Sequence, residues 1–265
     1  MIDERRGHAV LDLPSRGSKA MKIARLLGLE PGGPRRRLLE IGCGSGGISH
    51  WFGAAGPMGW DVEAVDVEDV RLVRDGYAFR TVAGTALPFE DAGFDVVLSN
   101  HVIEHVGDQA AQRVHLRELR RVLRDDGAGY IAVPNRWMLV EPHFRLPFLS
   151  WLPMPLSHAY VRLAGKGTHY DCLPLTCGRL EAMLEESGFA WRQHAGDALR
   201  LTFELERPDA AMYRHALRHV PDTAYAALRR AFPTLIYTLS PLPREAGDNA
   251  ASSRRALSRQ VGRSG

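Results

Sequence analysis

A short apolar strand that runs directly into a glycine-rich turn is the feature that most constrains how this chain folds. Residues 38–41 read LLEI, and Gly42, Gly44 and Gly47 follow in a GxGxxG pattern before an apolar helical segment at 48–55. Glycine permits a positive φ and lets a ligand approach the main chain closely. The pattern therefore predicts a strand, a tight turn and a helix, with a ligand site at the turn.

Strand and helix patterns alternate around this turn. Apolar runs predict further strands at 62–66, 77–82, 94–99, 130–133, 189–194 and 234–240. Helical spacing predicts helices at 18–29, 68–75, 108–123, 180–186 and 209–231. This alternation is typical of a doubly wound α/β fold with a mostly parallel sheet. We expect one domain over residues 1–243, with a cofactor-binding core at about 35–135.

Three stretches fall outside this alternation. Residues 135–173 carry prolines among aromatic residues, which predicts an irregular insertion over one end of the sheet, on the acceptor side. Residues 207–232 are predicted to be a helical insertion. Residues 244–265 hold the whole formal net charge of +3 and lack apolar periodicity, so they predict a flexible basic tail.

The composition excludes several classes of protein. With 265 residues, 45% of them hydrophobic and 25% charged, the chain is typical of globular proteins. No apolar run approaches the roughly 20 residues of a membrane-spanning helix, and no signal peptide is visible, so we expect a cytoplasmic protein. Residues 1–243 carry no formal net charge, so the sequence does not predict a basic groove for nucleic acid. The three cysteines form no CxxC pair, so neither disulfides nor a structural zinc site is expected.

Two acidic residues beside the turn indicate the class of cofactor. Asp66 ends the next predicted strand, where a carboxylate can accept hydrogen bonds from ribose hydroxyls. Glu40 lies two residues before the first glycine, where it would repel a pyrophosphate but favour a cationic amino-acid group. An NAD(P)-dependent oxidoreductase shares the glycines and Asp66 but does not account for Glu40, and it is the alternative enzyme class. A binding module without catalysis is the other alternative.

Several motifs, in order, resemble those of class I S-adenosylmethionine-dependent methyltransferases. The segment LLEIGCGSG at 38–46 resembles their first motif, and Val65 with Asp66 resembles the second. The segments GTALPF at 84–89 and FDVVLSNHVIEHV at 94–106 resemble the type 11 methyltransferase domain of ubiquinone and menaquinone biosynthesis. The resemblance implies a Rossmann-like, seven-stranded sheet whose last strand is antiparallel. It also implies S-adenosylmethionine across the ends of the first, second and fourth strands.

Position by position, the resemblance implies a set of cofactor contacts. The methionine part would lie beside Glu40, Gly42 and Gly44, with Cys43 as a spacer and Gly46 in the same turn. Asp66 would bind the ribose, and the adenine would contact Val65, Ala86 and Leu87. Asn100 and His101 would lie near the sulfonium. Many relatives have Asp at the position of Ala83, so the adenine is expected here to be held by backbone groups and apolar walls.

His101 and His105 are the predicted catalytic residues. Methyl transfer needs an aligned acceptor, and a hydroxyl acceptor also needs a base, for which histidine is suited by its pKa of about 6.5. The alternative for His105 is a packing role. Residues 101–105 also spell HxxEH, a zinc peptidase motif, but no later helix offers a third ligand. A Mg²⁺ role for Glu104 and His105 would lack the acidic ligand that some quinone-pathway relatives have at the His101 position. We expect no metal.

The insertion supplies candidate acceptor-binding residues, namely His143, Arg145, His169 and Tyr170. Histidines beside aromatic residues suit a pocket with an apolar body and a polar end. Residues 146–153 are predicted to form a lid, with peripheral membrane contact as the alternative. The acceptor is expected to be a small molecule or a lipid- or sugar-linked group that is methylated at oxygen. The sequence leaves its identity and the oligomeric state open.

Overall fold

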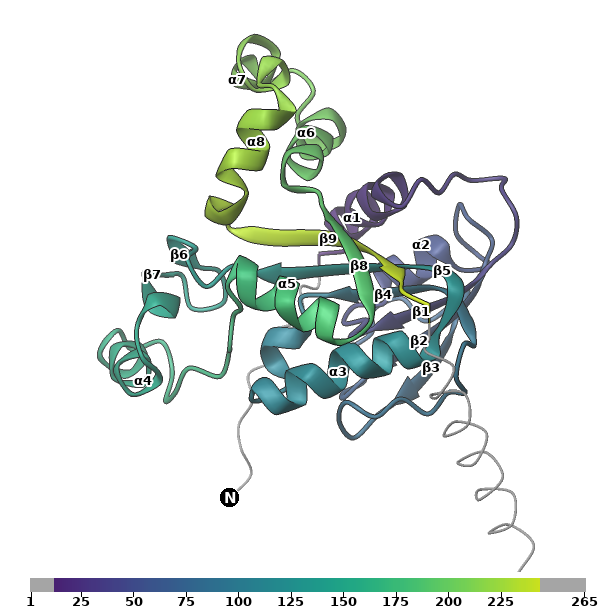
Figure 1. Ribbon diagram of the computed structural model, residues 1–265, viewed down its shortest axis with the longest axis horizontal. Coiled ribbons are helices and arrows are strands. Elements are labelled where there is room, and N and C mark those ends of the chain that lie inside the picture. The colour runs from purple at the N-terminus through teal and green to yellow at the C-terminus, as the bar shows by residue number, and fades with distance from the viewer. Residues whose placement is uncertain (1–11, 244–265) are drawn as a thin grey trace, which may run out of the picture.

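A seven-stranded sheet organises the computed structural model, which describes residues 12–243 (Figure 1). The strand order is β3-β2-β1-β4-β5-β9-β8, and β9 runs antiparallel to both of its neighbours, β5 and β8, whereas the remaining neighbouring strands are parallel. The predicted Rossmann-like sheet with an antiparallel last strand is therefore confirmed. The predicted basic tail lies outside the described residues. The strands are β1 (Arg37–Ile41), β2 (Asp61–Asp66), β3 (Ala78–Thr81), β4 (Phe94–Asn100), β5 (Leu123–Pro134), β8 (Phe189–Gln193) and β9 (Thr234–Pro241).

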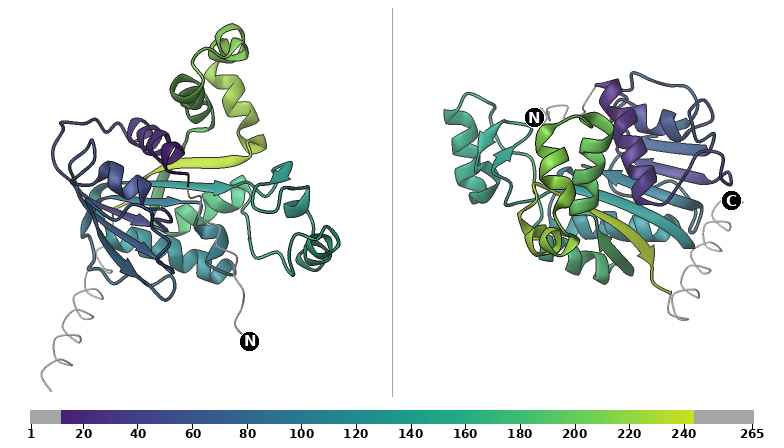
Figure 2. Two further views of the ribbon diagram at one scale, coloured as in Figure 1. Left: turned by 180° about the vertical axis from the view of Figure 1, so that it is seen from behind. Right: turned by 90° about the horizontal axis from the view of Figure 1, so that it is seen from above.

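Helices cover both faces of the sheet (Figure 2). Helices α3 (Gln109–Val122) and α5 (Cys177–Glu186) pack on one face, and α1 (Leu13–Leu26) and α2 (Gly47–Phe52) pack on the other. Successive residues of a strand point to opposite faces of the sheet and so pack against different helices. Leu39, Val97 and Ile131 join the α3 and α5 side, whereas Leu38, Val96 and Ala132 join the α1 and α2 side. Because both faces are buried, the strands read as continuous apolar runs in the sequence.

The predicted helix at 68–75 is wrong, because this segment consists of bends and extended chain. The backbone N–H groups of Leu72 and Val73 donate to the carbonyl of Ser45 at 3.0 and 3.1 Å. The Asp69 carboxylate accepts from the Arg71 side chain at 2.8 Å. The backbone N–H groups of Leu72 and Val73 thus bond to the glycine turn instead of forming helical hydrogen bonds within the segment. The first helix also begins earlier than predicted, at Leu13.

A helical arm connects β8 to β9 and projects from the sheet (Figure 1). It comprises α6 (Ala195–Glu206), α7 (Ala211–His215) and α8 (Asp222–Leu228), with short 3₁₀ turns at Leu217–His219 and Arg229–Ala231. The arm begins at Ala195, so the predicted start at 207 is wrong. Gly196 weakens the helical pattern in the sequence, but a Cβ there would stand 2.7 Å from the Tyr225 ring, so glycine lets α8 pack against α6. Within residues 12–243, no helix is both long and apolar enough to cross a bilayer.

The insertion at residues 135–173, predicted to lie on the acceptor side, projects from another end of the sheet (Figures 1 and 2). It contains the short strands β6 (Val140–Glu141) and β7 (Leu146–Pro147), the turn Leu149–Trp151 and helix α4 (Met154–Leu163). The helix α4 forms despite the prolines, because Pro155 lies in its first turn, where no backbone N–H is needed. A small core of its own holds the insertion together, made of Phe144, Leu146, Leu149, Val161, Tyr170 and Cys172.

Asn135 fastens both the insertion and the helical arm to the sheet. Its side chain is fully buried, and its Nδ2 donates to the carbonyls of Arg230 and Phe232 at 2.8 Å each. Its backbone N–H donates to the carbonyl of Pro233 at 2.8 Å, and the residue also pairs with Leu175. The start of the insertion, the chain just beyond its end and the end of the arm therefore meet at one residue.

Candidate active site

The glycine turn between β1 and α2 has its predicted form. Gly42 and Gly46 have φ values of +74° and +80°. A Cβ on Gly42 would stand 2.4 Å from Val102 Cγ2, and one on Gly46 would stand 2.1 Å from the hydroxyl oxygen of Tyr77. Both positions therefore require glycine, for conformation and for space. The contact with Val102 also places the turn against the segment that follows β4.

Glu40 is a buried carboxyl group at the end of β1. The Ser49 hydroxyl, from α2, donates a hydrogen bond to it. Burial raises the pKa of Glu40 to about 8, assisted by the negative charge of Asp66 and opposed by the Ser49 hydrogen bond. Glu40 is thus mostly protonated at neutral pH, and a cation placed beside it would favour release of that proton.

Asp66 joins the end of β2 to the glycine turn. Its Oδ2 accepts from the backbone N–H of Gly44 at 2.8 Å, and its Oδ1 accepts from the N–H of Val67 at 2.7 Å. A carboxylate has about four lone-pair positions, so Asp66 keeps capacity for further donors such as ribose hydroxyls. Cys43 is buried, and burial raises the pKa of its thiol, so it is a neutral residue of the turn as expected for a spacer.

The predicted adenine-side residues differ in exposure. Val65 is fully buried in the core, and its carbonyl accepts from the N–H of Gly42 at 2.8 Å. Ala86 is exposed, whereas Leu87 is buried. The Leu87 N–H donates to the Glu118 carboxylate at 2.8 Å, which ties this loop to α3. The adenine contacts of Val65, Ala86 and Leu87 stay predictions.

The end of β4 carries two unusual residues. Asn100 Oδ1 is buried and has no hydrogen-bond partner among the described residues. His101 has a φ of +58°, which is uncommon for a residue with a side chain, and its N–H donates to the carbonyl of Ala132 at 2.8 Å. The register that pairs Ile41 with Ser99 puts both residues next to the glycine turn.

Glu104 links the two histidines that the sequence singled out. Its carboxylate is buried, with Oε1 3.4 Å from His101 Nδ1 and 3.9 Å from His105 Nε2. Burial alone would raise the pKa of Glu104, but the contact with His101 and the charges of both histidines outweigh it and lower the pKa. The arrangement is a charged carboxylate between two imidazoles.

The insertion brings His143 against His105, with ring centroids 5.2 Å apart. His143 Nδ1 also lies 2.7 Å from Glu141 Oε1. Tyr170 is buried, and its hydroxyl has no hydrogen-bond partner among the described residues. Of the other predicted acceptor residues, Arg145 is exposed, and His169 contacts Thr168 and the ring of His158. Their roles stay predictions.

Sequence reasoning did not single out Glu141 or Cys172 as site residues. Cys172 Sγ lies 3.7 Å from His105 Nδ1 and 3.9 Å from His143 Nδ1, across sequence separations of 67 and 29 residues. Such separations leave no local spacing pattern. The only feature next to Cys172 in the sequence is the acidic residue Asp171, and an acidic residue beside a cysteine does not by itself indicate a site.

Comparison with known proteins identifies the core. Residues 39–131 match the family described as a methyltransferase domain. A ubiquinone biosynthesis O-methyltransferase of Azorhizobium caulinodans is 32% identical over 169 residues, which cover 60% of this chain and 61% of that protein. A probable S-adenosylmethionine-dependent methyltransferase of Mycobacterium tuberculosis is 39% identical over 115 residues, which cover 41% of this chain and 39% of the relative. The chain thus covers less than two thirds of the length of these relatives.

Solved structures agree on the fold. The complex between the Haloferax volcanii Trm112 methyltransferase activator and a methyltransferase gives a TM-score of 0.52 at 17% identity, covering 87% of this chain and 94% of the other. The [4+2]-cyclase SpnF gives 0.50 at 15% identity, covering 91% and 86%. A shared fold therefore does not fix the reaction. The family match and the ordered motifs identify the domain as well as its fold. Residues 39–131 are a methyltransferase domain of the class I, S-adenosylmethionine-dependent type.

Proposed function

We propose that this protein transfers a methyl group from S-adenosylmethionine to a hydroxyl oxygen of a small or lipid- or sugar-linked acceptor. The observation that carries the proposal is the convergence of Glu40, Asp66 and Asn100 at the carboxyl ends of adjacent parallel strands, with His101 next in the chain. In open α/β sheets, ligands bind at the carboxyl ends of the strands. The acceptor would then lie between this edge and the insertion.

The residues present fit the cofactor. Gly42 gives the turn a positive φ that brings the main chain close to the ends of β1 and β2, and Asp66 retains acceptor capacity for a ribose. Glu40, which holds a proton when no cation is near, would ionise beside an amino group. A donor from the ligand would satisfy the buried oxygen of Asn100. S-adenosylmethionine supplies an electrophilic methyl group on a positively charged sulfur when bound.

The chain's own residues then align the acceptor and take its proton. Glu104 Oε1 faces His101 Nδ1, so Nε2 is the ring nitrogen left to accept the proton of the hydroxyl group. The acceptor oxygen, freed of its proton by His101, would be aligned to receive the methyl group that the bound cofactor would supply. The charged Glu104 favours the imidazolium that results.

Two features of the insertion support an acceptor with an apolar body and a polar end. The orphaned hydroxyl of Tyr170 would gain a partner from an acceptor oxygen if the insertion shifts to admit it. Trp137, Phe148 and Trp151 form an exposed aromatic group in which Trp151 packs edge-on against the other two rings. Such a group suits a lipid-linked acceptor or peripheral contact with a membrane. The Azorhizobium caulinodans relative is an O-methyltransferase by name, which supports oxygen as the methylated atom.

Two measurements test the proposal. Calorimetric titration should show binding of S-adenosylhomocysteine and none of NADH; the reverse result would replace methyl transfer by nicotinamide chemistry. Transfer of a labelled methyl group should then be assayed with phenolic, sugar and lipid-linked hydroxyl acceptors. His101→Gln should abolish most of this transfer, whereas His215→Gln, on the exposed helix α7, is the matched histidine control. Equal activity of both variants would remove His101 from the chemistry.

A further inference from the structure

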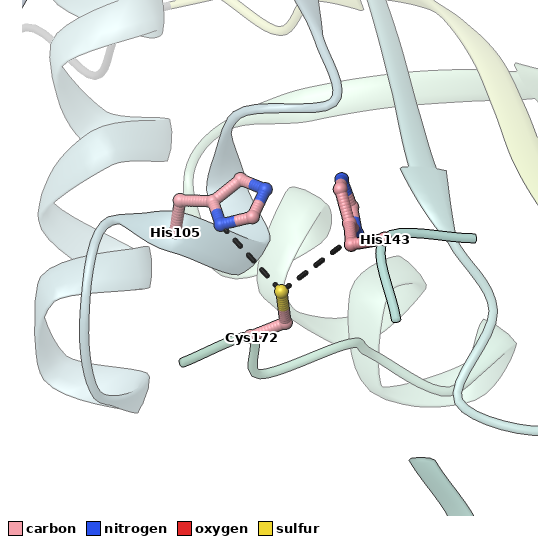
Figure 3. A group of neighbouring side chains, drawn as sticks. All are labelled: His105, His143 and Cys172. Carbon is pink, nitrogen blue, oxygen red and sulfur yellow. Dashed lines mark hydrogen bonds between the residues drawn. The ribbon is translucent and has the colours of Figure 1, made fainter. Parts of the chain in front are cut away.

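Three metal-ligating side chains meet beside the proposed acceptor region, from segments far apart in the sequence (Figure 3). His105 lies on the 3₁₀ turn Ile103–His105 after β4, His143 lies between β6 and β7, and Cys172 lies beyond α4. One nitrogen of each imidazole and the sulfur all lie within 4.8 Å of one another. In Figure 3 the sulfur of Cys172 lies between the two rings.

The separations between these atoms match those around a tetrahedral ion. Zinc takes a thiolate at about 2.3 Å and an imidazole nitrogen at about 2.0–2.1 Å, which places sulfur and nitrogen ligands about 3.5 Å apart. Cys172 Sγ lies 3.7 Å from His105 Nδ1 and 3.9 Å from His143 Nδ1. Both sulfur–nitrogen separations are therefore within a few tenths of an ångström of those around one ion, and the third pair of atoms lies within 4.8 Å, so modest side-chain shifts would bring all three to one ion.

The surroundings of these three residues favour a cation. The negative charges of Asp171, Glu141 and Glu104 all act on Cys172. Glu104 Oε1 also lies 3.9 Å from His105 Nε2, the ring nitrogen that would not bind the metal, and neither Glu104 oxygen forms a hydrogen bond within the described part of the chain. A carboxylate behind the second nitrogen of a ligating histidine is the usual support of such sites.

We propose that His105, His143 and Cys172 bind one divalent cation of the zinc class, with the fourth position open to water or to an oxygen of the acceptor. One thiolate and two imidazoles select zinc or a similar transition metal over Mg²⁺, which prefers oxygen ligands. The cation displaces two protons to solvent, the thiol proton of Cys172 and the proton that His143 Nδ1 shares with Glu141 Oε1 at 2.7 Å, and Glu141 remains beside it as a carboxylate partner. This assignment differs from the expectation of no metal, because two of the ligands come from the insertion.

Such an ion would join the insertion to the methyltransferase core. His105 belongs to the core, whereas His143 and Cys172 belong to the insertion, and the adjacent Leu173 N–H already donates to the carbonyl of Glu104 at 2.8 Å. The site is distinct from the cofactor residues Glu40 and Asp66. Its existence can therefore be tested apart from methyl transfer.

The test uses cobalt as a spectroscopic substitute for zinc. The full chain is freed of metal with a chelator and titrated with Co²⁺. We expect one equivalent to bind, with the near-ultraviolet charge-transfer absorption of a cobalt–thiolate bond, and the bound ion to raise the melting temperature. Cys172→Ser should lose the charge-transfer absorption, and His143→Gln should weaken Co²⁺ binding by more than about tenfold.

A matched cysteine keeps the test specific. Cys177 is also buried, but on α5, where its sulfur contacts Glu181 and Tyr237, and Cys177→Ser should leave the cobalt spectrum unchanged. Circular dichroism of the metal-free variants checks that each is folded. Three outcomes would overturn the proposal. The protein could fail to bind one equivalent of Co²⁺, the charge-transfer band could survive in Cys172→Ser, or the band could be lost only in Cys177→Ser. Binding of S-adenosylhomocysteine is measured on the same samples. It tests the cofactor site on its own, so the loss of the metal site can be distinguished from failure of the proposed function.

Discussion

Replacing Glu40 with Gln should remove a pH dependence from cofactor binding. Burial raises the pKa of Glu40 to about 8, so the carboxyl group is mainly protonated in the unliganded protein at neutral pH. A positively charged ligand favours the ionised form, and binding must therefore release the proton. Because release becomes easier as the pH rises, the affinity of the wild-type protein for S-adenosylmethionine should increase with pH below 8.

The size of the effect follows from the pKa. With a pKa of about 8, roughly one Glu40 in a hundred is ionised at pH 6 and about one in eleven at pH 7. If only the ionised form binds well, the affinity should rise about tenfold over this interval, or about 1.4 kcal/mol. At pH 7 each binding event should release about 0.9 proton from this residue. Glu40→Gln retains the shape of the side chain and can still bond to Ser49, but it has no proton to release.

Isothermal titration calorimetry at pH 6, 6.5 and 7, in buffers with different enthalpies of ionisation, measures both the affinity and the protons released. The ligand's own amino group stays largely protonated over this range, and its contribution is common to both proteins. An equal pH slope and equal proton release in the wild type and in Glu40→Gln would refute the placement of the cation beside Glu40.

Three further predictions concern the turn and the end of β4. Asp66→Ala should weaken S-adenosylhomocysteine binding by about 1–3 kcal/mol, because the ribose would lose its acceptor; an unchanged dissociation constant would contradict this role. His101→Gln should lower kcat by about 10² with little change in the acceptor KM; an effect on KM alone would make it a positioning residue. Gly46→Ala should lower the unfolding free energy in urea by about 3 kcal/mol or more, because its Cβ would overlap Tyr77. The control Gly59→Ala, with φ +66° but open space, should cost only about 1 kcal/mol of backbone strain, and equal losses would count against the overlap.

The grouping of Glu40, the glycine turn and Asp66 could be predicted from the sequence because these residues have fixed places on regular elements, whereas their role toward the cofactor stays a prediction. A carboxyl group at the end of β1, a glycine turn and Asp66 at the end of β2 necessarily come together once the strands are parallel neighbours. The helix α3 was also predictable, since Asp108 caps it by accepting from the N–H of Ala111 at 2.9 Å.

The contacts of the insertion could not be predicted in the same way, because they depend on how the insertion folds back on the core. The grouping of His105, His143 and Cys172 joins three segments with no common periodicity. The error at 68–75 has a similar origin, since the N–H groups of Leu72 and Val73 bond to the distant carbonyl of Ser45, and a tertiary contact overrides the local helical preference.

The buried amide of Asn135 makes the two inserts of this fold mechanically dependent on each other. A displacement of the helical arm that moved the carbonyls of Arg230 and Phe232 would pull on the first residue of the acceptor-side insertion. Conversely, an insertion that opened to admit a bulky acceptor would strain the base of the arm. A movement of α7 or α8 would therefore have a direct route by which to change the position of residues 135–173.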